Sequence, residues 1–148
     1  MEPREIDHAL LHRRRLPQPG NAGKDERGRL LILAGSAELP GAPLLVGDAA
    51  LRAGAGKLMI AAPSDSVMAL GMALAEARIA ALPAKPTRRL FEDRDAVLIG
   101  PGMTNREATR WADAALGWAA TAPTIFDAAA LDGLWDSERL RTRRRAAG

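Results

Sequence analysis

Three short motifs in this sequence place glycine or a carboxylate directly after an apolar, strand-like run. Gly35-Ser36 follows the run 30–34, Gly100-Pro101-Gly102 follows 95–99, and Asp127 follows 123–126. In a parallel sheet the strands end at one common edge, and ligands bind beyond that edge. Glycine allows a backbone to approach a ligand closely because it has no side chain. The three motifs together favour a binding site, although each one alone is also typical of an ordinary turn.

The segments that would position these motifs alternate between strands and helices. We expect strands over 30–34, 57–61, 77–82, 95–99 and 123–126, and helices over 42–53, from Ser64 or Asp65 to about 75, and from 104 to about 119. Pro40 and Gly41 introduce the first of these helices, and Gly54 follows its end. Alternating strands and helices predict an α/β domain with a mostly parallel sheet and right-handed crossovers.

Composition limits the class of protein and divides the chain. The 148 residues suffice for one domain, and the lack of cysteine excludes disulfides and thiolate chemistry and fits a cytoplasmic location. The net charge of +3 is concentrated in a tail over 137–148 with five arginines and one glutamate. Because the charge is not spread over a folded face, nucleic-acid binding is disfavoured. We expect an N-terminal arm and lead-in over 1–29, one domain over 30–136, and the tail.

Two other candidate sites are weaker. His8 and His12 are four residues apart and could share one face of a helix, but no further metal ligand is near them in the sequence, so no metal site is predicted. The segment Gly54-Ala55-Gly56-Lys57 resembles part of a phosphate-binding loop, yet it lacks that motif's spacing and following Ser or Thr. We interpret it as the end of a helix and a turn.

Taken in order, the motifs resemble one enzyme family. The segments KDERGRLLILAGSAELPGAPLLVGDAALRAGAGKLMIAAP, EARIAALP, DAVLIGPGM and TIFDAAALD are similar to the ADP/ATP-dependent NAD(P)H-hydrate dehydratases, from roughly Leu16 to Leu131. The resemblance implies the N-terminal, substrate-side half of a ribokinase-like three-layer fold. It also implies repair of hydrated NADH or NADPH, in which phosphorylation by ADP or ATP with Mg²⁺ converts the unwanted ring hydroxyl into a leaving group. The family tends to form homo-oligomers.

The resemblance also implies which residues touch the substrate. Ala42, at the start of the first helix, and Gly102 match family positions that contact the hydrated dinucleotide, and the helix start would offer free N–H groups to its phosphates. Asp127 could orient Mg²⁺ or the substrate, or it could simply cap the following helix. The predicted substrate-binding residues are Ala42, Gly102, Gly100, Gly35, Ser36 and Asp127.

The second half of the family pattern is not found in this sequence. The family's catalytic base lies in a Gly-x-Gly-Asp segment, whereas the one Gly-Asp pair here, Gly47-Asp48, falls inside the first predicted helix. No catalytic residue is therefore assigned.

Three explanations fit this departure: a truncated or frameshifted product, half of a split enzyme whose partner supplies the nucleotide site, or a degenerate fold reused for binding. The alternative function is a non-catalytic dinucleotide-binding or oligomer-forming remnant, and a related small-molecule kinase, such as a hydroxymethylpyrimidine kinase, is a further rival. Half a sheet exposes apolar surface, which predicts low stability or self-association.

Overall fold

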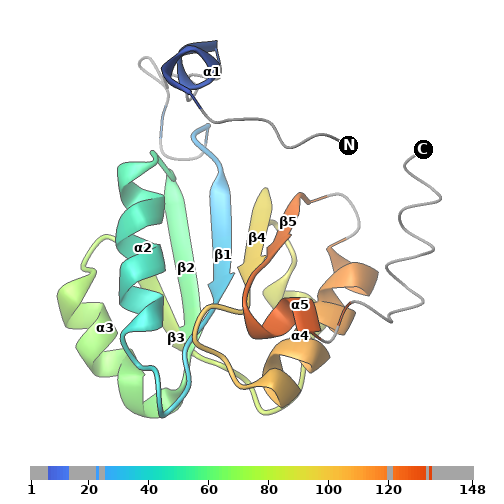
Figure 1. Cartoon of the computed structure of the whole chain (residues 1–148). Helices are drawn as coiled ribbons and strands as arrows, with labels where there is room; N and C mark the ends of the chain where they lie inside the picture. The colour runs from blue at the N-terminus through green and yellow to red at the C-terminus, as the bar shows by residue number, and fades with distance from the viewer. Residues whose placement is uncertain (1–6, 14–22, 24–25, 120–121, 133, 135–148) are drawn as a thin grey trace.

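A single parallel sheet organises the chain. The computed structural model describes residues 7–13, 23, 26–119, 122–132 and 134. Its five strands are β1 (Arg29–Leu33), β2 (Lys57–Ala62), β3 (Arg78–Ala81), β4 (Ala96–Ile99) and β5 (Thr124–Phe126). They lie in the order β3-β2-β1-β4-β5, and every pair is parallel. The central strand β1 therefore has β2 on one side and β4 on the other (Figure 1).

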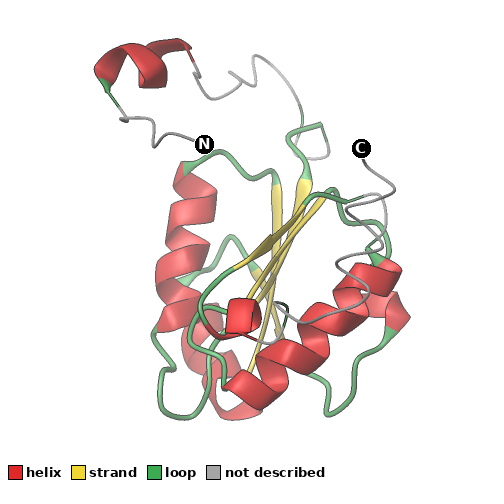
Figure 2. Cartoon of the chain, turned by 45° about the vertical axis from the view of Figure 1, so that its right-hand side comes forward, coloured by secondary structure: helices red, strands yellow, loops and turns green. Residues whose placement is uncertain are grey.

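Helices cover both faces of the sheet, which makes three layers (Figure 2). The helical segments are α1 (His8–Arg13), α2 (Ala42–Arg52), the 3₁₀ turn η1 (Ser64–Ser66), α3 (Val67–Ala73), the 3₁₀ turn η2 (Arg88–Leu90), α4 (Asn105–Trp118) and α5 (Ala129–Asp132). Helices α2 and α3 pack on one face, and α4 and α5 pack on the other. The α/β fold class predicted from the sequence is confirmed.

Alternating side chains of β1 belong to the two hydrophobic clusters on the opposite faces of the sheet. Leu31 and Leu33 point toward α4, whereas Ile32 and Ala34 point toward α2 and α3, and all four are fully buried. Successive residues of a strand face opposite sides of the sheet, so a strand covered on both faces is a continuous apolar run. On the α4 side, Trp111 is fully buried and lies 6.1 Å from Phe91 between ring centroids.

Most predicted elements are present within one or two residues of their expected limits. One prediction was wrong: neither Ser64 nor Asp65 caps a long helix, because both lie in η1, and α3 runs only from Val67 to Ala73 without a side-chain cap bond. The interpretation of 54–57 as a helix end is confirmed. Gly54 has φ +97°, and the Ala55 N–H donates to the Ala50 carbonyl at 3.1 Å, closing α2.

The predicted ends of the chain are described only in part. The arm and lead-in over 1–29 include the described residues 7–13, 23 and 26–29, and the tail over 137–148 lies outside the described residues. His8 and His12 share one face of α1, as predicted, with ring centroids 5.8 Å apart. Among the described residues, no helix is both long and apolar enough to cross a bilayer.

The side chain of Thr104 caps the N-terminus of α4, and this contribution to stability can be tested. The Thr104 hydroxyl accepts from the Glu107 N–H at 3.4 Å and donates to the Glu107 carboxylate at 2.9 Å. Thr104→Ala removes both bonds, so we expect the free energy of unfolding in urea to fall by about 1 kcal/mol. Thr87→Ala is the matched control, because Thr87 precedes η2 without a side-chain cap bond. Equal losses in the two variants would contradict this role for Thr104.

Candidate functional site

The loops that follow β1, β4 and β5 are joined by backbone hydrogen bonds. The Gly35 N–H donates to the Pro101 carbonyl at 2.8 Å, and the Gly100 N–H donates to the Leu33 carbonyl at 3.1 Å. The Asp127 N–H donates to the Ile99 carbonyl at 2.9 Å. The sheet's hydrogen bonding thus continues into all three loops, which fixes their positions relative to one another.

Glycine is required at two of these positions because other parts of the chain come very close. Gly102 has φ +67°, and a Cβ there would overlap the Cβ of Ala42. Gly100 has φ +124°, and a Cβ there would overlap the carbonyl oxygen of Asp127. Close packing of loop against loop therefore accounts for glycine at both positions, whether or not a ligand also approaches them.

The six predicted site residues consequently lie together. Gly102 is against Ala42, Gly100 is against Asp127, and a Cβ on Gly35 would lie 3.0 Å from the Pro43 side chain, in the first turn of α2. We call this group the carboxyl-end site; its members are Gly35, Ser36, Ala42, Gly100, Gly102 and Asp127. The predicted convergence of three strand ends at one edge of the sheet is present in the structure.

The start of α2 differs from the expectation of free N–H groups. The Ala42 N–H donates to the Leu39 carbonyl at 3.4 Å, and the Leu44 and Leu45 N–H groups both donate to the Gly41 carbonyl, at 3.1 and 3.2 Å. Pro43 has no N–H. Because tight turns use these donors, the helix start presents the half-buried Ala42 methyl group and the positive end of the helix dipole, but few donors.

The two side chains with oxygen atoms at this site play different parts. Ser36 is buried, and its hydroxyl accepts from the Leu39 N–H at 3.2 Å, which shapes the loop before α2. Asp127 is exposed, and its carboxylate makes no hydrogen bond to any described residue. Its backbone carbonyl accepts from the Ala130 N–H at 3.0 Å. The alternative that the Asp127 side chain caps the next helix is therefore wrong, and its carboxylate faces solvent.

A cavity of about 490 Å³, which was not predicted from the sequence, adjoins the carboxyl-end site. It is lined by Ala37, Pro40, Gly41, Leu44, Asp65, Ser66, Ala69, Leu70 and Ala73. None of the six predicted residues lines it, although Ala37 and Gly41 are their sequence neighbours. One signal was available: the segment Val67-Met-Ala-Leu-Gly-Met-Ala73 contains no charged residue, which is unusual for a surface helix.

The carboxyl-end site is not a complete site for Mg²⁺ or for a nucleotide. Within the described ranges, no group of three His, Asp or Glu side chains could hold a metal ion. Mg²⁺ prefers several oxygen ligands, and Asp127 offers one carboxylate. A phosphate needs converging donors, and those at the start of α2 are engaged within the chain.

Comparison with known proteins places the fold and the motifs in one family. The family model described as NAD(P)H-hydrate dehydratase matches residues 30–147. An ADP-dependent (S)-NAD(P)H-hydrate dehydratase of Xanthomonas campestris is 38% identical over 116 residues, covering 72% of this chain and 40% of that protein. The chain therefore spans well under half the length of this curated relative.

Solved structures agree with this similarity. The ADP/ATP-dependent NAD(P)H-hydrate dehydratase from Bacillus subtilis, co-crystallized with ATP/Mg²⁺, has a TM-score of 0.67 and 30% identity, over 83% of this chain and 45% of that one. A ribokinase-like superfamily protein from Enterococcus faecalis has a TM-score of 0.65 at 19% identity, over 80% of this chain and 43% of that one, and shows the fold alone. The expected ribokinase-like architecture is confirmed.

Gly100 provides a test of the loop packing at this site. Gly100→Ala places a methyl group against the Asp127 carbonyl at φ +124°, so we expect the free energy of unfolding to fall by roughly 3 kcal/mol or more. Gly71→Ala is the matched control, because Gly71 is an exposed helical residue whose nearest atom to an added Cβ is 4.0 Å away. This control is expected to gain about 0.5–1 kcal/mol. Urea unfolding measures both, and a Gly100→Ala variant as stable as the parent would contradict the packing.

Proposed function

The chain belongs to the NAD(P)H-hydrate dehydratase family, and from that membership we propose that it is the substrate-side part of an enzyme that dehydrates hydrated NADH or NADPH. The observation that carries the proposal is the contact between Gly102 and Ala42, the two positions that resemble substrate contacts of the family. The reaction class is that of a hydro-lyase, dependent on ADP or ATP as in the names of its relatives. We place it in the cytoplasm, in keeping with the lack of cysteine.

In this proposal the carboxyl-end site holds the dinucleotide substrate. The positive end of the α2 dipole, at Ala42, attracts the substrate's phosphates by charge alone, since the N–H groups there donate to the Leu39 and Gly41 carbonyls. The exposed Asp127 carboxylate accepts a hydrogen bond from a substrate hydroxyl or amide group. Because Gly35, Gly100 and Gly102 lock the loops together, the surface is rigid before the ligand arrives, which lowers the entropic cost of binding.

Mg²⁺, the nucleotide and the catalytic base are assigned to the remainder of the enzyme. Within the described ranges no group of three His, Asp or Glu side chains could hold a metal ion, and the N–H groups at the start of α2 are engaged within the chain. The Xanthomonas relative is more than twice as long as the part that matches. The remainder either continues this polypeptide or belongs to a separate chain. No step of the reaction is assigned to a residue of this chain.

Strand β5 is the place where the remainder would join. It forms one edge of the sheet and contains three residues, and Ile125 in its centre is 64% exposed. In the register of the sheet, Ile125 aligns with Leu98 and then Ile32, and Ile32 is fully buried under α2 and α3. A further strand and helix at this edge would pair β5 and cover Ile125.

A second copy of the chain is the proposed partner at the opposite edge. Met68 and Met72 of α3 are 79% and 82% exposed, and Leu45 of α2 is 74% exposed. Helix α3 packs beside β3, which forms the edge of the sheet opposite β5. Methionine-rich apolar patches are common in protein interfaces. This surface also favours the alternative function, an oligomer-forming remnant without catalytic activity.

Recovery of reduced-nicotinamide fluorescence from hydrated NADH tests the proposed activity. We expect no recovery with this chain, ADP and Mg²⁺ alone. Recovery should appear when the complementary C-terminal segment of the Bacillus subtilis relative is added. Strong turnover by the 148-residue chain alone would contradict the assignment of the catalytic base and the nucleotide site to the remainder of the enzyme. Hydrate binding without turnover in the mixture would favour the non-catalytic alternative.

Ala42→Asp separates binding from folding in the same assay. A carboxylate in the first turn of α2 favours the helix dipole, so we expect unchanged or higher stability. The same charge repels an anionic dinucleotide, so its affinity, measured by calorimetry, should fall at least tenfold. Ala49→Asp is the matched control, since Ala49 is an exposed residue of the same helix away from its start. Equal losses in both variants would remove Ala42 from the proposed site.

Self-association through α3 is tested by size-exclusion chromatography with light scattering. We expect the parent chain to form dimers or larger species at micromolar concentration. The double variant Met68→Lys/Met72→Lys should shift it toward the monomer, whereas Met68→Leu/Met72→Leu should not, because leucine keeps the patch apolar. A parent chain that is monomeric at high concentration would contradict the proposed interface.

A further inference from the structure

Basic side chains gather at the end of the sheet opposite the carboxyl-end site. Arg29, Lys57 and Arg78 are the first residues of β1, β2 and β3, and Arg94 lies in the turn before β4. We call these four residues the basic cluster. Arg29 is aligned with Lys57, and Arg78 is aligned with Met59, two residues further along β2. Because side chains alternate along a strand, the three strand residues share the face that α4 covers.

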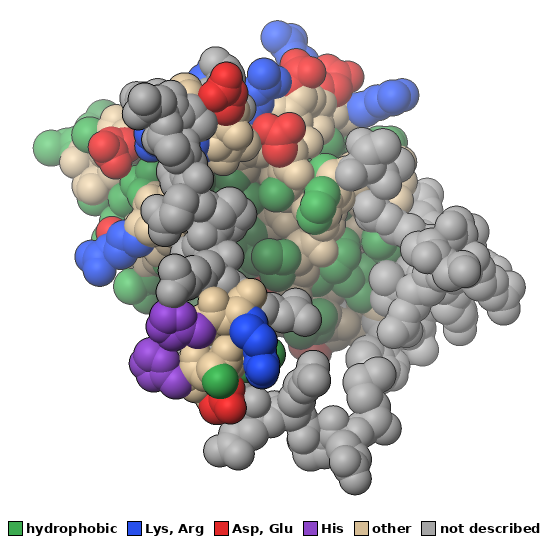
Figure 3. All heavy atoms as spheres, turned by 90° about the horizontal axis from the view of Figure 1, so that it is seen from above, with side chains coloured by type: hydrophobic (Ala, Val, Ile, Leu, Met, Phe, Trp, Pro, Cys, Tyr) green, Lys and Arg blue, Asp and Glu red, His purple; other side chains and the backbone are tan. Residues whose placement is uncertain are grey.

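Figure 3 views the molecule from this end. Lys and Arg side chains, in blue, lie along one rim together with Asp and Glu side chains. A five-residue strand rises ~3.3 Å per residue, so the cluster lies roughly 15 Å from the carboxyl-end site. The two regions are therefore separate sites.

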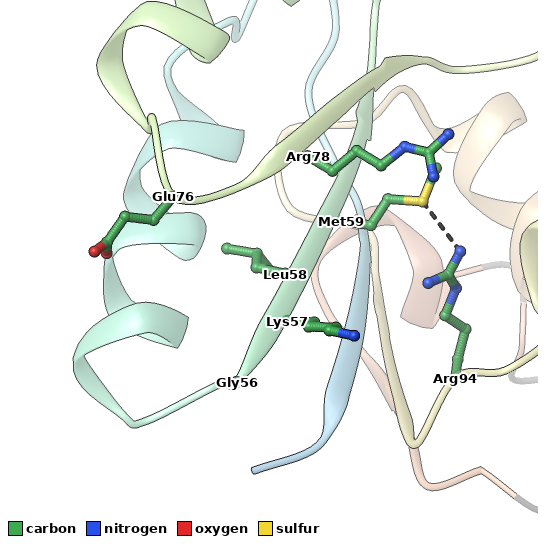
Figure 4. A pocket seen from close by; sticks show the side chains of 7 residues that line it. All are labelled: Gly56, Lys57, Leu58, Met59, Glu76, Arg78 and Arg94. Carbon is green, nitrogen blue, oxygen red and sulfur yellow. Dashed lines mark hydrogen bonds between the residues drawn. The ribbon is translucent and has the colours of Figure 1, made fainter. Parts of the chain in front are cut away.

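Two adjoining cavities of about 280 Å³ each open beside the basic cluster, and they share Met59, Arg78 and Arg94. The first also includes Lys57 and Glu76, and the second includes Arg89. The Arg78 and Arg94 side chains both reach toward the Met59 sulfur, whereas the Glu76 carboxylate points away from them (Figure 4). The cavities thus meet at two guanidinium groups.

Neither shared arginine is neutralised by a neighbouring carboxylate. Within the part of the chain that the structure describes, Arg78 and Arg94 have no Asp or Glu oxygen within ion-pair distance. Arg94 instead donates to the Met59 sulfur and to the Leu90 carbonyl, both at 3.2 Å. Sulfur is a weak acceptor, and both contacts leave the positive charge uncompensated.

Burial and two neighbouring positive charges disfavour the charged form of Arg94. Burial is the main cause that lowers the pKa of Arg94, and the positive charge of Arg78 is the next. Asp93 acts in the opposite direction, but more weakly than Arg78, and Arg29 lowers the pKa further. An anion bound between these groups would relieve the repulsion.

We propose that the basic cluster binds a phosphate-bearing small molecule, with Arg78 and Arg94 holding its phosphate oxygens. A guanidinium group can donate two parallel hydrogen bonds to a phosphate. The guanidinium groups of Arg78 and Arg94 both line the two adjoining cavities (Figure 4). Lys57 and Arg89 extend the positive charge into the two cavities. Among the described residues of the lining, no aromatic side chain is present on which a nucleic-acid base could stack, which favours a small ligand over a single strand. This site is independent of the proposed dehydratase function.

Calorimetry with inorganic pyrophosphate, in low-salt buffer and with the full 148-residue chain, tests the proposal. We expect saturable binding that Arg78→Gln weakens about tenfold or more. Arg78→Lys should lose part of the affinity, because it keeps the charge but removes the planar fork. Arg110→Gln, an exposed arginine of α4, is the matched control and should bind as the parent does.

Arg94→Gln should also weaken pyrophosphate binding, but it removes a hydrogen bond to Leu90, so its circular dichroism has to match that of the parent. The Arg78 side chain makes no hydrogen bond to any described residue, and the Arg78 variants therefore decide the outcome even if Arg94→Gln unfolds. Absence of saturable binding, or equal loss in Arg110→Gln, would overturn the proposal. Loss in Ala42→Asp without loss in Arg78→Gln would place the phosphate at the carboxyl end and overturn it too. Tighter binding of a single-stranded oligonucleotide, lost in Arg78→Gln, would replace the small ligand by nucleic acid.

Discussion

The parallel register of β1 with its two neighbours is the constraint on which the rest of the structure depends. Leu33 is aligned with Ala61 of β2 and with Ile99 of β4, so the chain leaves these strands at the same level. The bonds from Gly35 to Pro101 and from Gly100 to Leu33 extend this register into the loops. The same alignment brings Arg29 and Lys57 side by side at the other end. One set of hydrogen bonds thus determines which residues meet at both edges.

The glycines at the carboxyl end are explained by packing before any ligand is considered. Gly100 and Gly102 have positive φ values and contact backbone or side-chain atoms of Asp127 and Ala42. A side chain at either position would separate the loops, and the three strand ends would no longer form one surface. The glycines therefore serve a binding site indirectly, by holding together the residues that would form it.

The sequence was sufficient for the elements whose signals are local. Apolar runs bounded by glycine or proline predicted the strands, Pro40, Gly41 and Gly54 predicted α2, and the periodicity of residues 104–119 predicted α4. The family resemblance then selected Ala42 and Gly102, and the structure brings them into contact. None of these inferences required knowledge of which strands are neighbours.

The features that the sequence did not reveal depend on the order of the strands in the sheet or on local hydrogen bonds. The use of the α2 N–H groups within a tight turn is set by the loop that Ser36 shapes, and residue types do not report it. Arg29, Lys57 and Arg78 are far apart in the sequence and meet only because β2 lies between β1 and β3. A sequence motif does not predict such a cluster, because the order of the strands in the sheet determines which residues meet.

Helices α2 and α3 cover β1 but leave β5 exposed on the same face of the sheet. A segment that covered β5 would therefore also affect the stability of the domain. Along one row, Ile32 is fully buried, Leu98 is partly exposed and Ile125 is 64% exposed, so the cover by α2 and α3 ends between β1 and β5. Complete burial of an isoleucine side chain contributes about 1.5–3 kcal/mol, which is a substantial part of the stability of a small domain. The indole N–H of Trp111 adds a cost of about 1–3 kcal/mol, because it is buried without an acceptor among the described residues. A segment that pairs with β5 and covers Ile125 would therefore stabilise this domain as well as extend it, so that folding and assembly of the site are linked.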